Sequence, residues 1–496
     1  MKIKILLWGQ DPLYFGIAHN LQKMLDCELY AIFDTTNKPK KFFLKQKLVK
    51  FEKKWFYHDN IKKIHPVDID YLQKFEKKYN INLWKLAINE RIFYKFNDFH
   101  HFSSEEILSI EEDICKLFET ILDEVKPDYL ISHVPNLHHQ EILFQLCNAK
   151  GIKTLILSNP ILGYKTRLSE SRKIKNSIKK NNQSNSSGRS FQEMRNYLDS
   201  FDNFKQLKTS FNKKSNTNLI RSAFEYIFSS DNSHEKSHYS YFGRTKIHVL
   251  QYMIKLYFHK TKRKKFIEKN FFKEINLKQP YVYFPLGVEP EANILLNAPF
   301  FTNQIETIRI IAKSLPVGYQ LYVKENPGQV TREWREISEY QKIMDIPNVK
   351  LLHPSFSNRK LLQNSSIVIT IGGSSGFEAA FYEKPSMVFS DTIYTLLPSV
   401  YRIKELDQIP EMMQKCLSEK VCEQDLDEFI NLLEEETFNF DLRGFYSKIH
   451  DYFFLGGTLQ DREISEQQMF DFLKNENESL VTITSEYIKK LTSQKE

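Results

Sequence analysis

The fold is decided by residues 281–389, which include the following four stretches: YVYFPLGVEPEANILLNAPFF (281–301), LYVKENPGQVTREW (321–334), IPNVKLLHP (346–354) and SSIVITIGGSSGFEAAFYEKPSMVF (365–389). Short apolar runs typical of strands alternate here with runs typical of helices. The pattern predicts strands at 281–286, 320–323, 349–352, 367–371 and 386–389, and helices at 303–314, 332–344, 357–364 and 375–383. Strands that alternate with helices favour an open parallel sheet.

Polar corners follow three of these strands. They are EPE at 289–291, KENP at 324–327 and GGSSGFE at 372–378. Ligands of open parallel sheets bind outside the carboxyl ends of the strands. The start of a helix also favours negative charge. The three corners therefore predict a site for an anionic, sugar-bearing ligand.

The third corner offers groups for a phosphate and a ribose. Gly372 and Gly373 let the backbone approach a ligand closely. Ser374 or Ser375 can cap the following helix or donate to a phosphate, and Glu378 can accept hydrogen bonds from ribose hydroxyls. An ordinary strand-to-helix turn with a serine N-cap explains the same residues equally well.

The other two corners add a cation, an amide and two carboxylates. Lys324 at a strand end can pair with a phosphate, and Asn326 can both donate to and accept from a base or sugar. Glu289 and Glu291 can orient sugar hydroxyls or act as an acid/base pair. The alternative is a pair of surface turns.

The chain opens with a second α/β pattern, in which a strand at 2–8 leads through a corner into a helix and a further strand. It lacks GxGxxG, so the dinucleotide fingerprint is missing. The strand ends carry Asp11 and His133, which are candidates for a general base. His138 and His139 follow closely, but no carboxylate completes a familiar metal-ligand spacing, and we predict no metal.

Composition narrows the class of protein. The net charge of +8 is scattered along the 496 residues, so we expect no nucleic-acid partner. The five cysteines include no CxxC and indicate reduced thiols in a cytoplasmic protein. No apolar run has the ~18–20 residues that cross a bilayer. We therefore expect a cytoplasmic location, which also allows peripheral contact with the inner face of the membrane.

The middle of the chain differs from both α/β patterns. Residues 171–189 are polar and of low complexity, which predicts a flexible loop. Residues 245–272 combine apolar and aromatic residues with a basic run at 260–265. Both a membrane-surface helix and a packed helix with a solvated basic end fit this pattern, and we favour the packed helix.

The α/β pattern of residues 281–389 resembles the bacterial capsule polysaccharide biosynthesis proteins, relatives of the capsule Kdo transferases. The resemblance is carried by FPLGVEPEANILLNAPFFTNQIETI, LPVGYQLYVKENPGQVTR, IPNVKLL and GGSSGFEAAFYEKPSMVF, within residues 279–400. Members usually have histidine where this chain has Gly287 and Asn326, and TGTxGWEA where it has IGGSSGFEA. In the resembling transferases the second of these histidines helps to hold the nucleotide phosphate.

The resemblance implies an α/β, GT-B-like fold: two Rossmann-like lobes facing a cleft, with a helical insertion and a helical C-terminal tail. The expected parts are an acceptor lobe (1–170), a loop and helical linker (171–278), a nucleotide-sugar lobe (279–403) and a helical extension (404–496). It implies a glycosyltransferase of capsule or surface polysaccharide synthesis, with a nucleotide-sugar donor, a glycan or lipid-linked acceptor and no cofactor. The alternatives are a sugar-nucleotide epimerase and, because two family histidines are replaced, a non-catalytic polysaccharide-binding or export partner.

Overall fold

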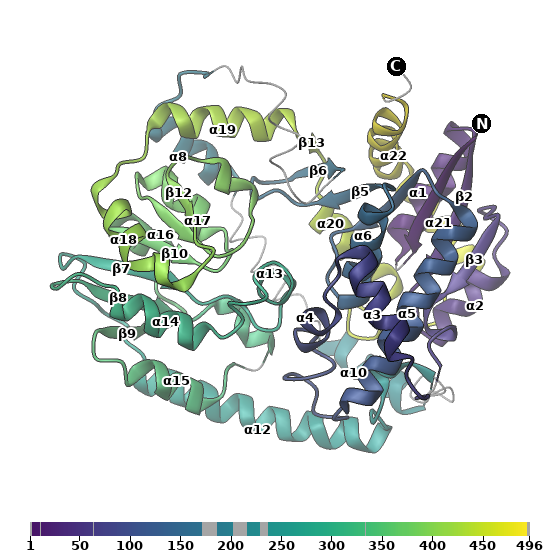
Figure 1. The fold of residues 1–496 in the computed structure, drawn as a ribbon, viewed down its shortest axis with the longest axis horizontal. Helices are drawn as coiled ribbons and strands as arrows, with labels where there is room; N and C mark the ends of the chain where they lie inside the picture. Colours follow the sequence, from purple (N-terminus) through teal and green to yellow (C-terminus); the bar gives the residue numbers. More distant parts are fainter. Residues whose placement is uncertain are drawn as a thin grey trace. The chain divides into compact units, whose positions relative to one another are not determined.

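The computed structural model describes residues 2–9, 11–62, 64–170, 186–201, 216–228, 237–332 and 334–493. They form two compact units, whose elements are labelled in Figure 1. Unit 1 comprises Met1–Arg172, Asn203–His248 and Glu436–Glu496, and unit 2 comprises Lys173–Asp202 and Val249–Glu435. Most of the expected flexible loop, residues 171–185, lies outside the described residues.

Within the described residues, unit 1 is built on a seven-stranded sheet in the order β13-β6-β5-β4-β1-β2-β3. The five strands from β5 to β3 are parallel, and β6 and β13 add an antiparallel edge. The strands are β1 (Ile3–Gly9), β2 (Cys27–Phe33), β3 (Lys53–Phe56), β4 (Tyr129–His133), β5 (Lys153–Ser158), β6 (Lys165–Ser169) and β13 (Phe438–Asn439). The order of the parallel strands is that of the doubly wound Rossmann fold.

The helices of unit 1 begin where the sequence supplies capping groups. Asp11 caps α1 by accepting from the amides of Leu13 and Tyr14, and Ser103 and Glu106 form a capping box at the start of α5. The helices are α1 (Pro12–Met24), α2 (Asn37–Lys45), α3 (Ile69–Tyr79), α4 (Leu83–Ile88), α5 (Ser104–Val125), α6 (His138–Ala149), α10 (Asn216–Phe228), α20 (Leu442–Phe453), α21 (Glu466–Asn475) and α22 (Asn477–Thr492), with 3-10 turns η1 (Tyr57–Asp59) and η2 (Tyr239–Tyr241).

The C-terminal segment completes unit 1. Apolar side chains of α20, α21 and α22 share one core with β1, α1 and β2. Gly16 of α1 allows this packing, because a Cβ there would lie 2.7 Å from the Leu480 side chain of α22. The sequence grouped residues 404–496 as one helical extension, whereas the structure puts 404–435 with unit 2 and 436–496 with unit 1. The expected domain limits as a whole stay a prediction.

Unit 2 contains a six-stranded sheet among its described residues, in the order β12-β11-β10-β7-β8-β9. Every pairing is parallel. The strands are β7 (Tyr281–Pro285), β8 (Gln320–Lys324), β9 (Val349–Leu352), β10 (Ile367–Thr370), β11 (Ser386–Val388) and β12 (Val400–Arg402). If these six strands are numbered 1 to 6 in chain order, with β7 as the first, the sheet again has the 3-2-1-4-5-6 order of doubly wound folds. The expectation of two Rossmann-like α/β units is thus confirmed.

The helices of unit 2 are labelled in Figure 1, where most of them are coloured teal to green. They are α8 (Phe191–Ser200), α12 (Lys246–Asn270, of which the part from Val249 belongs to unit 2), α13 (Ala292–Leu295), α14 (Gln304–Lys313), α15 (Ile337–Met344), α16 (Asn358–Asn364), α17 (Ser375–Glu378), α18 (Ile409–Ser418) and α19 (Glu423–Glu435), with 3-10 turns η3 (Pro327–Arg332), η4 (Ala379–Tyr382), η5 (Ile393–Leu396) and η6 (Leu406–Gln408). The helix expected at 332–344 was predicted too long, because η3 and an irregular stretch precede α15.

Candidate functional site

The predicted corners of unit 2 meet at one edge of its sheet. β7 and β10 are neighbours, and the strand order reverses between them. Glu289 follows β7, and the glycine-rich corner 372–378 follows β10. Lys324 is the last residue of β8 and is paired in register with Pro285 of β7. This edge is the topological switch point at which ligands of doubly wound sheets bind.

Lys324 is a buried cation without a direct partner. Its side chain is only 5% exposed, and it makes no hydrogen bond or ion pair within the described residues. Burial lowers the pKa of Lys324 to about 8, and the nearby Glu378 carboxylate acts in the opposite direction. An ammonium group in such surroundings is costly unless an anion joins it. A strongly perturbed pKa of this kind marks a candidate functional residue.

Glu378 is held by a chain of hydrogen bonds. The Ser374 hydroxyl donates to its Oε1 at 2.6 Å and the Asn358 amide donates to its Oε2 at 3.3 Å. The Tyr283 hydroxyl donates to Asn358 Oδ1 at 2.6 Å. Burial raises the pKa of Glu378, while these bonds and Lys324 lower it. Lys324, Ser374 and Glu378 therefore belong to one electrostatically coupled group, as the sequence led us to expect.

The sequence missed two members of this group. Tyr283 lies in the middle of an apolar strand, where an aromatic residue indicates the core, and it is indeed fully buried. Asn358 begins α16 and has no distinguishing neighbour in the sequence. Only the pairing of β7 with β10 brings the two residues to the same edge as Glu378.

The glycine-rich corner differs from the expectation in two respects. The helix predicted at 375–383 is only four residues of α17 followed by the 3-10 turn η4, so a helix dipole contributes little. The amide of Gly373 already donates to Thr370 Oγ1 at 3.1 Å. Within the described residues, the amides of Ser374 and Ser375 make no hydrogen bond. They remain the two donors available to an anion.

The glycines of this corner are required by packing. A Cβ at Gly372 would lie 2.1 Å from the Ser390 hydroxyl, and one at Gly376 would lie 3.0 Å from the Tyr394 ring. The Tyr394 hydroxyl donates to the Gly373 carbonyl at 2.6 Å and fixes the turn. Close packing against Ser390 and Tyr394 thus fixes the backbone conformation of the corner, and with it the position of Ser374.

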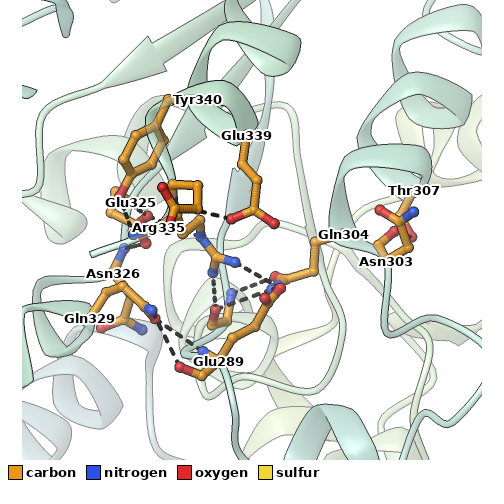
Figure 2. A network of polar contacts seen from close by, with 12 residues as sticks. Glu289, Asn303, Gln304, Thr307, Glu325, Asn326, Gln329, Arg335, Glu339 and Tyr340 are labelled. Atoms are coloured by element: carbon orange, nitrogen blue, oxygen red, sulfur yellow. Dashed lines mark hydrogen bonds and ion pairs between the residues drawn. The ribbon is translucent and has the colours of Figure 1, made fainter. Parts of the chain in front are cut away.

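The other two corners are tied together by Arg335, as Figure 2 shows. Its guanidinium lies 2.7 Å from Glu289 Oε1 and 3.0 Å from Glu325 Oε2. All three side chains are buried. The Tyr340 hydroxyl also donates to Glu325 Oε2, at 2.8 Å. Burial raises the pKa of Glu325, and Arg335 opposes that effect. The carboxylate of Glu289 thus helps to hold the corners in place, and its expected contact with a donor stays a prediction.

Gly287 and Asn326 have structural partners in the same network. The Gly287 amide donates to Gln304 Oε1 at 2.7 Å, and a Cβ at this position would lie 2.8 Å from Ile294. Asn326 Oδ1 accepts from the Gly328 amide at 2.9 Å, which stabilises the turn after β8. Glu291 occupies the N-cap position of α13 and is half-buried. No sequence signal identified Arg335, which lies in a region expected to be helical.

The candidate base residues of unit 1 lie at the switch point of its own sheet, after β1 and β4. Asp11 accepts from Leu13 N at 2.9 Å as the cap of α1, and burial raises its pKa to about 6. His133 is the last residue of β4 and lies 3.2 Å from Gln140 Oε1 through its Nε2. Both positions agree with the expected strand ends.

A buried group of histidines and carboxylates, which the sequence did not reveal, lies in the same unit. His138 lies between Glu90 and Glu111, at 3.1 Å and 3.3 Å. Both carboxylates are buried, and burial raises the pKa of Glu111 to about 7. Asp34 contacts both His139 and His58 at 3.2 Å. The acidic partners are 24 to 105 residues away in the chain, so spacing could not reveal them.

A cavity of about 650 Å³ lies at the opposite edge of the unit 1 sheet, at the amino ends of β1, β4 and β5. Its lining includes Lys2, Lys126, Lys150 and Lys153, and none of the predicted site residues. Lys150 is paired with Asp123, so part of this positive charge is neutralised. In the parts of the chain that the structure describes, no group of three or more His, Cys, Asp or Glu side chains is arranged to hold a metal ion.

Two doubly wound units, each with its polar residues at the carboxyl edge, define an α/β protein of the GT-B-like class. Residues 175–398, somewhat under half of the chain, match the model of the capsule polysaccharide biosynthesis protein family. This match confirms the resemblance seen in the sequence and extends it through α12. Among curated proteins, none matches the chain.

Similar solved structures are distant. The UDP-GlcNAc 2-epimerase from Methanocaldococcus jannaschii is 12% identical, with 88% of this chain and 100% of that chain covered and a TM-score of 0.25. The Thermosulfurimonas dismutans KpsC beta Kdo 2,7 transferase is 14% identical, with 70% and 87% covered and a TM-score of 0.31. The beta Kdo 2,4 transferase of the same protein is 10% identical, with 60% and 78% covered and a TM-score of 0.30.

Proposed function

We propose that the protein is a glycosyltransferase of capsule or other surface polysaccharide synthesis. The family match over residues 175–398 supports the pathway. The donor is a nucleotide-activated sugar, and the acceptor is a glycan or a lipid-linked glycan. Unit 2 binds the donor at the carboxyl edge of its sheet, where Lys324 and the corner 372–378 lie.

The observation that carries this proposal is the buried Lys324, whose ammonium makes no direct ion pair or hydrogen bond within the described residues, although the Glu378 carboxylate is near. A phosphate placed against it would supply a further counter-charge and could accept from the Ser374 and Ser375 amides. Glu378, fixed through Ser374 and Asn358, is placed to accept from a sugar hydroxyl. Donors arranged before the reaction stabilise the charge that develops on a departing phosphate.

Transfer also needs a base that takes the proton from the acceptor hydroxyl. Asp11 and His133 of unit 1 are the candidates, and we favour Asp11. A general base works best when its pKa is close to the working pH, and burial has raised the pKa of Asp11 to about 6. Asp11 is then ionised at neutral pH and still basic enough to accept a proton. In this proposal Glu289 and Arg335 position the corners.

The test is a thermal-shift screen of the purified protein against CMP-, UDP-, GDP- and dTDP-sugars. A ligand at a hundred times its Kd adds about 2.7 kcal/mol to the free energy of unfolding, which is readily detected. The Glu378→Ala variant should lose most of the response to the nucleotide sugar that stabilises the wild type. Glu339→Ala, at the start of α15, is the matched control and should retain it.

Two results would count against glycosyl transfer. Stabilisation by none of the four classes of nucleotide sugar would favour a non-catalytic polysaccharide-binding role. Alternatively, incubation with the stabilising nucleotide sugar and no acceptor could yield a sugar of inverted configuration still linked to the nucleotide. That product would identify an epimerase instead.

A further inference from the structure

Helix α12 exposes an apolar face to solvent. Only Arg263 and Ile267 of its 25 residues are buried. Six large apolar side chains are between 42% and 70% exposed: Ile247, Leu250, Met253, Ile254, Tyr257 and Phe258. The sequence favoured an ordinary packed helix here, and that prediction was wrong for the first half of α12.

The exposed residues form one stripe. At 100° per residue, positions 247, 250, 254, 257 and 258 recur at the spacing of a single helix face. The opposite side carries Val249, Leu256 and Ile267, which are less exposed. The first half of α12 is thus apolar on both sides. Such a helix is normally covered on both sides, by protein or by lipid.

As far as Ile267, the charged residues of α12 are all basic. From residue 246 to residue 267 the sequence contains no Asp or Glu, and the first acidic residue is Glu268. Lys260, Lys262, Lys264 and Lys265 are exposed immediately after the apolar stripe. Arg263 differs from them, because it is buried and contacts the Trp334 carbonyl at 3.1 Å. It anchors the second half of the helix and leaves the lysines free to face outward.

Helix α10 of unit 1 also exposes apolar side chains and contacts Lys246, the first residue of α12. The Lys246 ammonium donates to the Ile227 carbonyl at the end of α10, at 2.9 Å. Helix α10 itself exposes Leu219, Ile220, Phe224, Ile227 and Phe228, by 41% to 71%. Both helices are labelled in Figure 1.

We propose that α12 is a membrane-docking helix that lies in the surface of an anionic lipid bilayer. Its apolar stripe would enter the boundary between headgroups and acyl chains, where Tyr257 and Phe258 suit the interface. The lysines that follow would contact anionic headgroups. A second copy of this chain is a poorer occupant, because it would bring the same positive charge against itself. No helix in the described ranges has the length and hydropathy needed to cross a bilayer.

The test is flotation of the full-length protein with vesicles of phosphatidylcholine alone or mixed with phosphatidylglycerol. We expect binding to the mixed vesicles at least about tenfold stronger than to the neutral ones. Raising the salt concentration should weaken it, since exposed charges are screened. Equal binding to both kinds of vesicle, or to neither, would overturn the proposal.

Variants separate this face from the rest of the surface. Ile254→Gln with Phe258→Gln should weaken binding at least about tenfold, because two large apolar side chains no longer enter the lipid. Val317→Gln with Phe300→Gln is the matched control on positions that are even more exposed, and it should bind as the wild type does. Both pairs change exposed residues, and circular dichroism checks that the fold is unaltered. Wild-type binding by the first pair would refute the assignment.

The lysines have a matched control as well. Lys262→Gln, Lys264→Gln and Lys265→Gln together should reduce binding to anionic vesicles at least about tenfold. Replacing Lys313, Lys342 and Lys360 together by glutamine should leave this binding unchanged, because these lysines are exposed elsewhere on unit 2. The wild type could instead bind no vesicles and self-associate in sedimentation, with the Ile254 and Phe258 double variant remaining monomeric. That result would assign the apolar face of α12 to contact with a second copy of the chain. This inference does not depend on glycosyl transfer, which the nucleotide-sugar screen tests separately.

Discussion

Replacing Lys324 by methionine should make unit 2 more stable while removing its nucleotide binding. Methionine has similar length and no charge. The ammonium has an ordinary pKa of 10.5, and burial lowers it to about 8 in the folded state. One pKa unit corresponds to about 1.4 kcal/mol, so the charged lysine costs the folded state roughly 3 kcal/mol at neutral pH.

The sign of the pH dependence follows from the lowered pKa. Below pH 8, Lys324 is protonated in both the folded and the unfolded state, and the full cost is present. Between pH 8 and 10.5 the folded protein loses this proton first, so the cost decreases as the pH rises. The stability gained by Lys324→Met should therefore be largest at neutral pH and vanish above pH 10.5.

Thermal unfolding followed by circular dichroism measures this gain, at about 2–4 °C per kcal/mol for a unit of this size. Lys342→Met, an exposed position, is the control and should change stability little. Nucleotide-sugar binding should be lost in Lys324→Met. In the wild type, nucleotide-sugar binding near pH 8.5 should be accompanied by proton uptake, because a bound phosphate favours the ammonium form of Lys324. Calorimetry in buffers of different ionisation enthalpy detects that uptake. A destabilised variant, or binding without proton uptake, would refute the role given to Lys324.

Three further variants test the surroundings of the site and the buried acids. Arg335→Ala leaves two buried carboxylates unpaired and should destabilise unit 2 by about 3–5 kcal/mol in urea unfolding; a loss below 1 kcal/mol would contradict the pairing. Ser374→Ala removes the 2.6 Å hydrogen bond to Glu378 and should weaken nucleotide-sugar binding by about 1 kcal/mol in calorimetry, and unchanged affinity would argue against this position for the ligand. Glu111→Gln should stabilise unit 1 by roughly 1–3 kcal/mol at pH 8 but not at pH 4. Burial has raised the pKa of this carboxyl, which lies near His138 and Glu90, to about 7, so its ionised form costs stability as the pH rises from 4.5. An equal effect at both pH values would show that the charge is not responsible.

The strands of both units could be predicted from the sequence because they are buried on both faces and read as continuous apolar runs. β8 and β9 occur almost where predicted, at Gln320–Lys324 and Val349–Leu352. β3 (Lys53–Phe56) was missed, since it begins with two lysines at the edge of the sheet and has no apolar run. The sequence pattern therefore predicts a strand only where burial of the strand requires a run of apolar residues.

The candidate site was predicted in part. Lys324 and Glu378 could be identified because each follows an apolar strand. Arg335 and Asn358 could not, because their roles depend on partners that the sheet order brings near, such as Glu325 and Glu378. The partner of Glu289 escaped the sequence for the same reason: the sequence shows a carboxylate at a strand end but not the Arg335 guanidinium that lies 2.7 Å from it.

The return of the C-terminal segment to unit 1 affects how the protein is made. Translation delivers the α1 and β1 surfaces hundreds of residues before α22, whose Leu480 covers Gly16. Until synthesis ends, that apolar surface has no lasting cover and is open to chaperones or to aggregation. The residues of unit 2 from Val249 to Glu435, in contrast, leave the ribosome as one uninterrupted stretch. The later-synthesised half can thus complete its core first, and a stop codon after residue 435 would damage the opposite half of the molecule.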